Sequence, residues 1–112
     1  MKARFCLALN LKDDPHSISE YRKYHQAVWP EITRSIKAAG VEDLEIYLVG
    51  NRLFMVLEVG ESFSWEAKSQ ADHENPKVQE WERLMDRFQQ PLPQAKPGEK
   101  WSLMERIFKL EA

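Results

Sequence analysis

The sequence predicts an α+β domain in which an antiparallel sheet carries helices on one of its faces. Two observations lead to this fold class. Runs of strand length and stretches of helical periodicity follow one another in the order β-α-β-β-α-β, and each helical region is split in two. That order is the ferredoxin-like arrangement. A chain of 112 residues is expected to form a single domain over residues 1–112.

The first strand is expected at residues 3–12, where FCLALNL is a short apolar run. A helix should follow at residues 15–27. Asp14 is a suitable N-cap residue, and Pro15 is suited to the first helical position because its missing N–H is not needed there.

A second helical piece is expected at residues 31–39. Pro30 disfavours α geometry at Trp29 and therefore implies a kink or a restart of the helix. Gly40 is a normal residue to end it, since glycine adopts a left-handed conformation readily.

Two strands are expected next, at residues 44–49 and 52–59. Gly50-Asn51 between them is a signal for a two-residue hairpin turn.

Helical periodicity returns at residues 63–71 and 76–89. In the second stretch the apolar residues fall on one helix face; they are Val78, Trp81, Leu84, Met85 and Phe88. Three prolines and a glycine make residues 89–101 a long surface loop without regular structure. Residues 104–110 contain RIFKL, which alternates like a strand and should finish the sheet beside the strands of the first half.

One face of such a sheet has no helices on it. That face should carry apolar side chains from several strands, so a partner is expected to cover it. A homodimer packed sheet against sheet is the simplest solution.

Composition excludes several classes of partner. The chain is 43% hydrophobic and 30% charged with a net charge of −2, which is ordinary for a globular protein. Nucleic acids and anionic membranes both require a concentrated basic face, and no block of like charges occurs. No segment approaches membrane-spanning length.

Cys6 is the single cysteine, so a disulfide framework within one chain is impossible. The reducing cytoplasm is the expected location, and no signal peptide is expected at the N-terminus. Cys6 could be a nucleophile, but a small hydrophobic residue in a strand is the simpler interpretation.

Tyr21, His25 and Trp29 follow one another at four-residue spacing, which places Tyr21 and His25 on one side of a helix. Histidine can donate and accept protons near neutrality because its ordinary pKa is about 6.5. A tyrosine one turn away can bond a substrate hydroxyl or orient the imidazole. The alternative is simple amphipathic packing, with His25 bonded to a carbonyl at the helix end. Spacing alone leaves both open.

Tyr47 has the opposite parity to its apolar neighbours in its strand, so it faces either the helices or a partner. Trp81 by default belongs to the core, and Glu82 by default faces solvent.

No metal or nucleotide cofactor is expected. His16, His25 and His73 are scattered, and no HExxH or paired-cysteine spacing exists. The four glycines stand alone and form no phosphate-binding loop.

The pattern Y-x-x-x-H-x-x-x-W-P-E at residues 21–31 resembles the L-rhamnose mutarotase family of small bacterial sugar epimerases. Ile46-Tyr47-Leu48, the N-x-L-F of residues 51–54 and Trp81 in its helix continue the resemblance. It covers most of the chain up to about Met85.

The resemblance implies a dimeric α+β barrel and a mutarotase that needs neither metal nor cofactor and acts on a monosaccharide. It implies that His25 is the catalytic proton donor. It also implies that Tyr21, Tyr47 and the Trp81-Glu82 pair line the sugar site, and Trp29 could offer its ring to the sugar.

One departure concerns specificity. Where the rhamnose enzymes tend to carry two adjacent tryptophans, this chain has Trp81-Glu82. The ending of the chain, RFQQPLPQAKPGEKW…MERIFKL, looks like the branch associated with L-fucose catabolism. The resemblance therefore favours L-fucose slightly over L-rhamnose as substrate.

Two other classes of function compete with this one. Small dimeric ferredoxin-like barrels include cofactor-independent monooxygenases, which need a pocket for a flat aromatic substrate. A non-catalytic sugar-binding dimer would bind a sugar without turnover.

Overall fold

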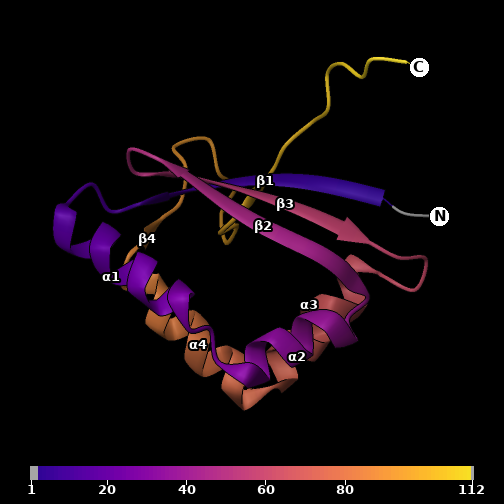
Figure 1. Cartoon of the computed structure of the whole chain (residues 1–112), viewed down its shortest axis with the longest axis horizontal. Helices are drawn as coiled ribbons and strands as arrows, with labels where there is room; N and C mark the ends of the chain where they lie inside the picture. Colours follow the sequence, from indigo (N-terminus) through magenta and orange to yellow (C-terminus); the bar gives the residue numbers. More distant parts are fainter. Residues whose placement is uncertain (1–2, 112) are drawn as a thin grey trace.

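The computed structural model describes residues 3–111. A five-stranded sheet forms one layer, and all the helices of the described residues lie on one of its faces (Figure 1). The strands that form its main path lie in the order β2-β3-β1-β4. The predicted α+β class, with an antiparallel sheet and helices on one face, is confirmed.

The elements follow the predicted order, with a split helical region in each half. They are β1 (Ala3–Leu11), α1 (Pro15–Gln26), α2 (Pro30–Ala38), β2 (Val41–Val49), β3 (Arg52–Val59), α3 (Trp65–Glu74), α4 (Pro76–Asp86), β4 (Gln89–Gln90) and β5 (Ser102–Leu103). Most boundaries lie within a few residues of the prediction. The exceptions are the two short strands after α4, which were not predicted.

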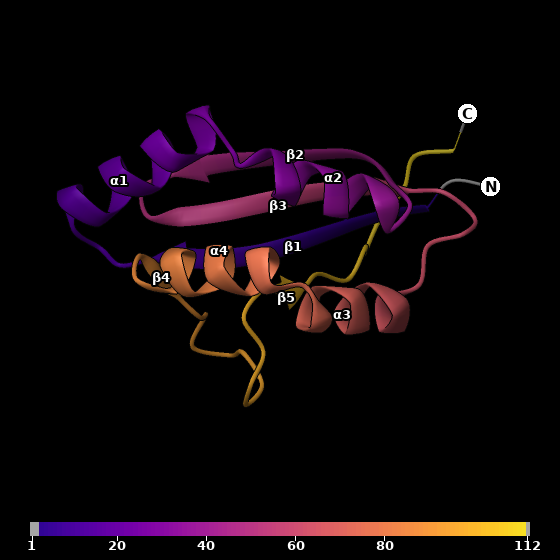
Figure 2. The same cartoon turned by 90° about the horizontal axis from the view of Figure 1, so that it is seen from below.

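The helices form two rows beneath the sheet, α1–α2 and α4–α3 (Figure 2). Polar side chains cap the starts of α1, α3 and α4. Asp14 accepts a hydrogen bond from the backbone N–H of Ser17 at 2.8 Å, and Pro15 follows at the first helical position as predicted. Gly40 ends α2 in a left-handed conformation, with φ of 97°.

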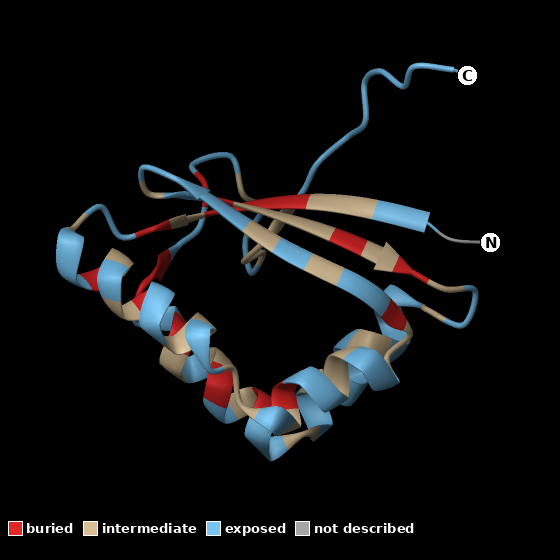
Figure 3. Ribbon diagram, in the orientation of Figure 1, coloured by how far each residue is buried: buried red, intermediate tan, exposed pale blue. Residues whose placement is uncertain are grey.

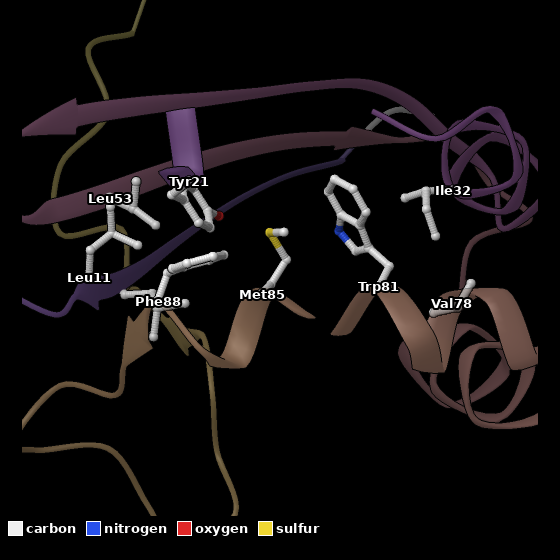
Figure 4. Close-up of a cluster of buried hydrophobic side chains, with 9 residues drawn as sticks. Leu11, Tyr21, Ile32, Leu53, Val78, Trp81, Met85 and Phe88 are labelled. Carbon is white, nitrogen blue, oxygen red and sulfur yellow. The ribbon is translucent and has the colours of Figure 1, made fainter. Parts of the chain in front are cut away.

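Alternation along the central strands assigns their side chains to two faces. The side chains on the face toward the helices include four that are fully buried: Leu9 and Leu11 of β1 and Leu53 and Leu57 of β3. Buried residues concentrate where the sheet and the helices meet (Figure 3). Tyr21, Trp81, Met85 and Phe88 belong to the larger cluster of this core, between the sheet and α4 (Figure 4).

The predicted C-terminal strand at residues 104–110 is wrong. Two short strands pair with β1 instead, both antiparallel. Gln89–Gln90 pairs with Asn10 and Leu11, and Ser102–Leu103 pairs with Leu7 and Ala8. Regular pairing therefore occurs at the start of the predicted loop of residues 89–101, in β4, and directly after it, in β5.

Residues 104–111 form an extended tail that is exposed throughout and leaves the sheet on the side away from the helices (Figure 1). The side chains of Ile107, Phe108 and Leu110 are 91%, 74% and 80% exposed. RIFKL has the alternation of a strand, but a strand needs a neighbouring strand with which to bond. The chain leaves β1 after the Met104 N–H donates to the Cys6 carbonyl oxygen, so RIFKL pairs with no strand within residues 3–111.

The second face of the sheet is not covered by helices. Tyr47 and Phe54 lie on it beside one another, with ring centroids 6.5 Å apart. A groove of about 440 Å³ runs over this region and continues onto Leu92, Leu103 and Met104. The apolar second face expected from the sequence is therefore present.

None of the helices within residues 3–111 combines the length and the apolar character needed to cross a membrane.

Asn75 provides a test of how the second helical row is built. It ends α3 and starts α4, where its Oδ1 accepts from the N–H groups of Lys77 at 3.0 Å and Val78 at 3.3 Å. Asn75→Ala should lower the free energy of unfolding by about 1 kcal/mol and the melting temperature by about 4 °C. Asn75→Asp keeps an acceptor and should lose much less. Equal thermal unfolding curves for wild type and Asn75→Ala would contradict the capping role.

Candidate active site

A cavity of about 440 Å³ lies between the helical face of the sheet and the two rows of helices. That volume is within the range of about 300–1,000 Å³ usual for small-molecule sites. Its walls come from α1, α2, β2, β3 and α4 and from the segment that follows α4. The lining residues include Tyr21, His25, Val28, Leu44, Ile46, Met55, Trp81, Glu82, Met85, Gln89, Lys100 and Trp101.

His25 and Tyr21 lie together in this cavity, as their four-residue spacing predicts. Their ring centroids are 4.3 Å apart, and the rings are tilted by 31°. Nδ1 of His25 lies 2.9 Å from the backbone carbonyl oxygen of Tyr21. A carbonyl oxygen only accepts hydrogen bonds, so Nδ1 carries a proton and donates it. In the neutral imidazole, Nε2 therefore keeps its lone pair.

Of the two interpretations of His25 that the spacing left open, the structure shows the bond to a carbonyl, and the catalytic role stays a prediction. The ring is bonded to a carbonyl in the last turn of α1, and it also lines the cavity. Burial lowers the pKa of His25 below its usual value, and the bond to Tyr21 opposes that effect. The neutral form therefore predominates at pH 7.

The hydroxyl of Tyr21 is a protonated donor at neutral pH. Burial raises the pKa of Tyr21 to about 12, and the hydrogen bond from Gln89 acts in the opposite direction. In the cavity, His25, which titrates below pH 7, therefore lies beside Tyr21, which stays protonated well above pH 7.

Trp81 forms an apolar wall next to His25, with ring centroids 5.6 Å apart and the rings steeply inclined. The indole is buried and belongs to the larger core cluster. Trp29 does not line the cavity. Its ring packs against Trp81 at 5.1 Å, so it supports the wall from behind.

Glu82 lies on α4 next to Trp81 and reaches the cavity. Its Oε2 lies 3.5 Å from Nε2 of Gln79. Lys37, Asp43 and Lys100 also line the cavity, so its walls combine aromatic rings with charges of both signs.

Tyr47 is not part of this cavity. It lies on the uncovered face of the sheet, is 54% exposed and lines the second groove. Its opposite parity left two sides open, and the structure places it on the side away from the helices. The neighbouring Ile46, with the other parity, lines the cavity in its place.

Gln89, Lys100 and Trp101 are among the lining residues that the sequence did not single out. They flank or belong to the proline-rich segment, whose loop composition gave no sign that it returns to the helices. An ion pair of 2.6 Å between Nζ of Lys100 and Oδ1 of Asp86 holds the end of this segment against α4. Trp101 packs against the core cluster beside it.

Within residues 3–111, no three or more His, Cys, Asp or Glu side chains are grouped so as to hold a metal ion. The side chains of the cavity suit another task. They can bind a small polar molecule against aromatic rings and move protons on it through His25.

Comparisons with known proteins show which family this chain resembles. The family model of L-rhamnose mutarotase matches residues 4–110. The chain is 45% identical over 109 residues to an L-fucose mutarotase of Xanthomonas campestris pv. campestris, covering 96% of this chain and 87% of that one. It is 31% identical over 113 residues to an L-rhamnose mutarotase of Burkholderia cenocepacia, covering 94% and 97%.

A solved structure shares the fold. The crystal structure of an L-rhamnose mutarotase from Formosa agariphila superposes with a TM-score of 0.72 at 21% identity, over 97% of this chain and 99% of that one. The match of the family model to nearly the whole chain, with the two curated relatives, establishes the relationship. The chain belongs to the L-rhamnose mutarotase family.

Proposed function

We propose that this mutarotase interconverts the α and β pyranose anomers of a 6-deoxy-L-hexose, with L-fucose preferred over L-rhamnose and His25 as the proton carrier. The observation that carries the proposal is the state of His25. Its Nδ1 is engaged by a backbone carbonyl, which leaves Nε2 to serve a ligand in the cavity.

Exchange of anomers requires a proton to leave the anomeric hydroxyl and a proton to reach the ring oxygen. The bond from the anomeric carbon to the ring oxygen then breaks, giving the open aldehyde. After the carbonyl turns its other face, the ring closes by the reverse steps. No electrons and no groups are transferred to the protein, so general acid–base catalysis suffices.

One imidazole can serve both oxygens because both are bonded to the same carbon. Neutral His25 accepts the proton of the anomeric hydroxyl at Nε2, and the resulting imidazolium donates to the ring oxygen. In closure the roles reverse. Tyr21, as a protonated donor beside His25, can hold a sugar oxygen, and the face of Trp81 can support the C–H edge of the ring.

The preference for L-fucose rests on two observations. The relative with 45% identity is named L-fucose mutarotase, whereas the named L-rhamnose mutarotase of Burkholderia cenocepacia is 31% identical. Glu82 lines the cavity with a carboxylate. L-fucose and L-rhamnose differ in hydroxyl stereochemistry, which a hydrogen-bonding side chain can discriminate.

A homodimer is the assembly that the shape of the molecule favours. The sheet has an uncovered apolar face with a groove. In the tail, the apolar side chains of Ile107, Phe108 and Leu110 are exposed to solvent. In a dimer, a second copy covers this face and the tails pack on the partner. Stable interfaces of this kind bury about 2,000 Å² or more.

Replacing His25 tests the mechanism. His25→Ala should reduce the acceleration of anomer exchange by about 10²- to 10⁴-fold, measured by saturation-transfer NMR on L-fucose. His16→Ala removes an exposed histidine of the same helix outside the cavity and is the control. Circular dichroism should show that both variants fold. Exchange by His25→Ala at the wild-type rate would exclude His25 as the proton carrier, and a purely sugar-binding protein would show no exchange even as wild type.

The pH dependence of exchange tests the same residue. Because burial lowers the pKa of His25, the neutral form persists to a lower pH than for an ordinary histidine. The value of kcat/KM should therefore be constant near pH 7 and fall only as the pH drops below the usual histidine pKa of about 6.5. A flat profile from about pH 5 to pH 9 is incompatible with a histidine that must start neutral.

Specificity should depend on Glu82. Glu82→Trp removes the carboxylate and should shift the ratio of the exchange rates of L-fucose and L-rhamnose towards L-rhamnose by about 10-fold or more. Glu82→Gln keeps hydrogen-bonding capacity at the same length and is the matched control. A wild type that prefers L-rhamnose would overturn the fucose preference but not the mutarotase activity.

The tail tests the dimer. Sedimentation of the intact chain at micromolar concentration should show a dimer, and removal of residues 105–112 should give a folded monomer. This variant should lose the dimer and keep its fold, because it retains Met104, whose N–H donates to the Cys6 carbonyl oxygen at 2.8 Å. Removal of residues 111–112 alone is the control. An intact chain that sediments as a monomer would refute the dimer.

A further inference from the structure

Gln89 is a polar side chain in the wall of the cavity, and the proton chemistry described above does not use it. It is 9% exposed and lies at the start of β4, where its backbone pairs with Leu11. Its Nε2 lies 3.4 Å from the hydroxyl oxygen of Tyr21, which is near the upper limit for such a bond.

The carbonyl oxygen of the same carboxamide lacks a partner. Oε1 of Gln89 is buried, and no hydrogen bond reaches it from the part of the chain that the structure describes. Buried side-chain oxygens of this kind are rare, because each loses its contact with water without a replacement. The terminal torsion of glutamine has a broad energy profile, so the carboxamide can turn within its place at low cost.

We propose that Gln89 is a specificity-determining residue of this site, with its carboxamide hydrogen-bonded to one hydroxyl of the sugar and to Tyr21. This inference rests on the proposed function and deepens it. Gln89 lines the same cavity as His25 and Trp81, so a sugar that reaches the imidazole also comes to the carboxamide. A hydroxyl of the sugar supplies the donor that Oε1 lacks.

The bond to Tyr21 has a second consequence for the ligand. Nε2 of Gln89 donates to the tyrosine oxygen, so the hydroxyl hydrogen of Tyr21 is directed elsewhere. The pair then presents one acceptor from Gln89 and one donor from Tyr21. Such a pair distinguishes sugars by the direction of a single hydroxyl, because the wrong epimer leaves both groups unpaired in a buried place.

Gln89→Met tests this role, because methionine has a similar length and volume but cannot form these bonds. We measure kcat/KM of anomer exchange for L-fucose and for its 2-deoxy, 3-deoxy and 4-deoxy derivatives. Gln89→Met should reduce the value for L-fucose by about 3- to 10-fold. For the one derivative that lacks the bonded hydroxyl, wild type and variant should be nearly equal. Gln90→Met, at the exposed next position of β4, should match wild type with every sugar.

An equal loss for all four sugars would show that Gln89 only supports the structure and would overturn the inference. A readout of binding separates this inference from the proposed function. In the ¹H–¹⁵N spectrum, the side-chain amide of Gln89 is identified by its absence from Gln89→Met. It should shift on titration with L-fucose together with the indole N–H of Trp81.

A shift of Trp81 without a shift of Gln89 would refute the role of Gln89 and leave the mutarotase proposal standing. Shifts of both without any exchange catalysis by wild type would refute the proposed function and leave the contact standing. No shift of either at saturating sugar would refute both.

Discussion

The packing of Trp81 against the first helical row is the interaction on which the rest of the structure depends. Trp81 comes from α4, yet its indole packs against three rings from the other half of the chain. The ring centroids lie 6.4 Å from that of Tyr24, 5.6 Å from that of His25 and 5.1 Å from that of Trp29. A large aromatic side chain buries much apolar surface, so this contact joins the two halves firmly. The same indole is a wall of the cavity, and its position therefore limits where a ligand in the cavity can lie.

The catalytic proposal depends on a histidine held in a mostly apolar place. Burial alone would favour a neutral ring with either tautomer, but the carbonyl of Tyr21 holds the proton on Nδ1. The helix end thus supplies the orientation that an imidazole needs for proton transfer. A similar balance applies to Tyr21, whose hydroxyl stays protonated because burial raises its pKa, while the hydrogen bond from Gln89 acts in the opposite direction.

The alternation of the strands separates two functions in one sheet. Side chains such as Ile46 and Met55 face the helices and line the cavity, while Tyr47 and Phe54 face the opposite side. The cavity needs no residue from the uncovered face. The proposed dimer contact and the proposed site therefore use opposite faces of the same strands and different side chains.

The local pattern of the sequence determined most of the fold and the centre of the site. Hydrophobic periodicity and capping residues such as Asp14 and Gly40 predict helices and strands because these depend on neighbours a few positions away. Spacing likewise predicts that Tyr21 and His25 meet. The tertiary structure alone decided which side of the sheet Tyr47 faces, that Gln89, Lys100 and Trp101 return to the cavity, and that the RIFKL segment is no strand. Each of these depends on partners distant in sequence, since a strand forms only where a neighbouring strand bonds to it and a loop residue lines a site only where long-range packing brings it.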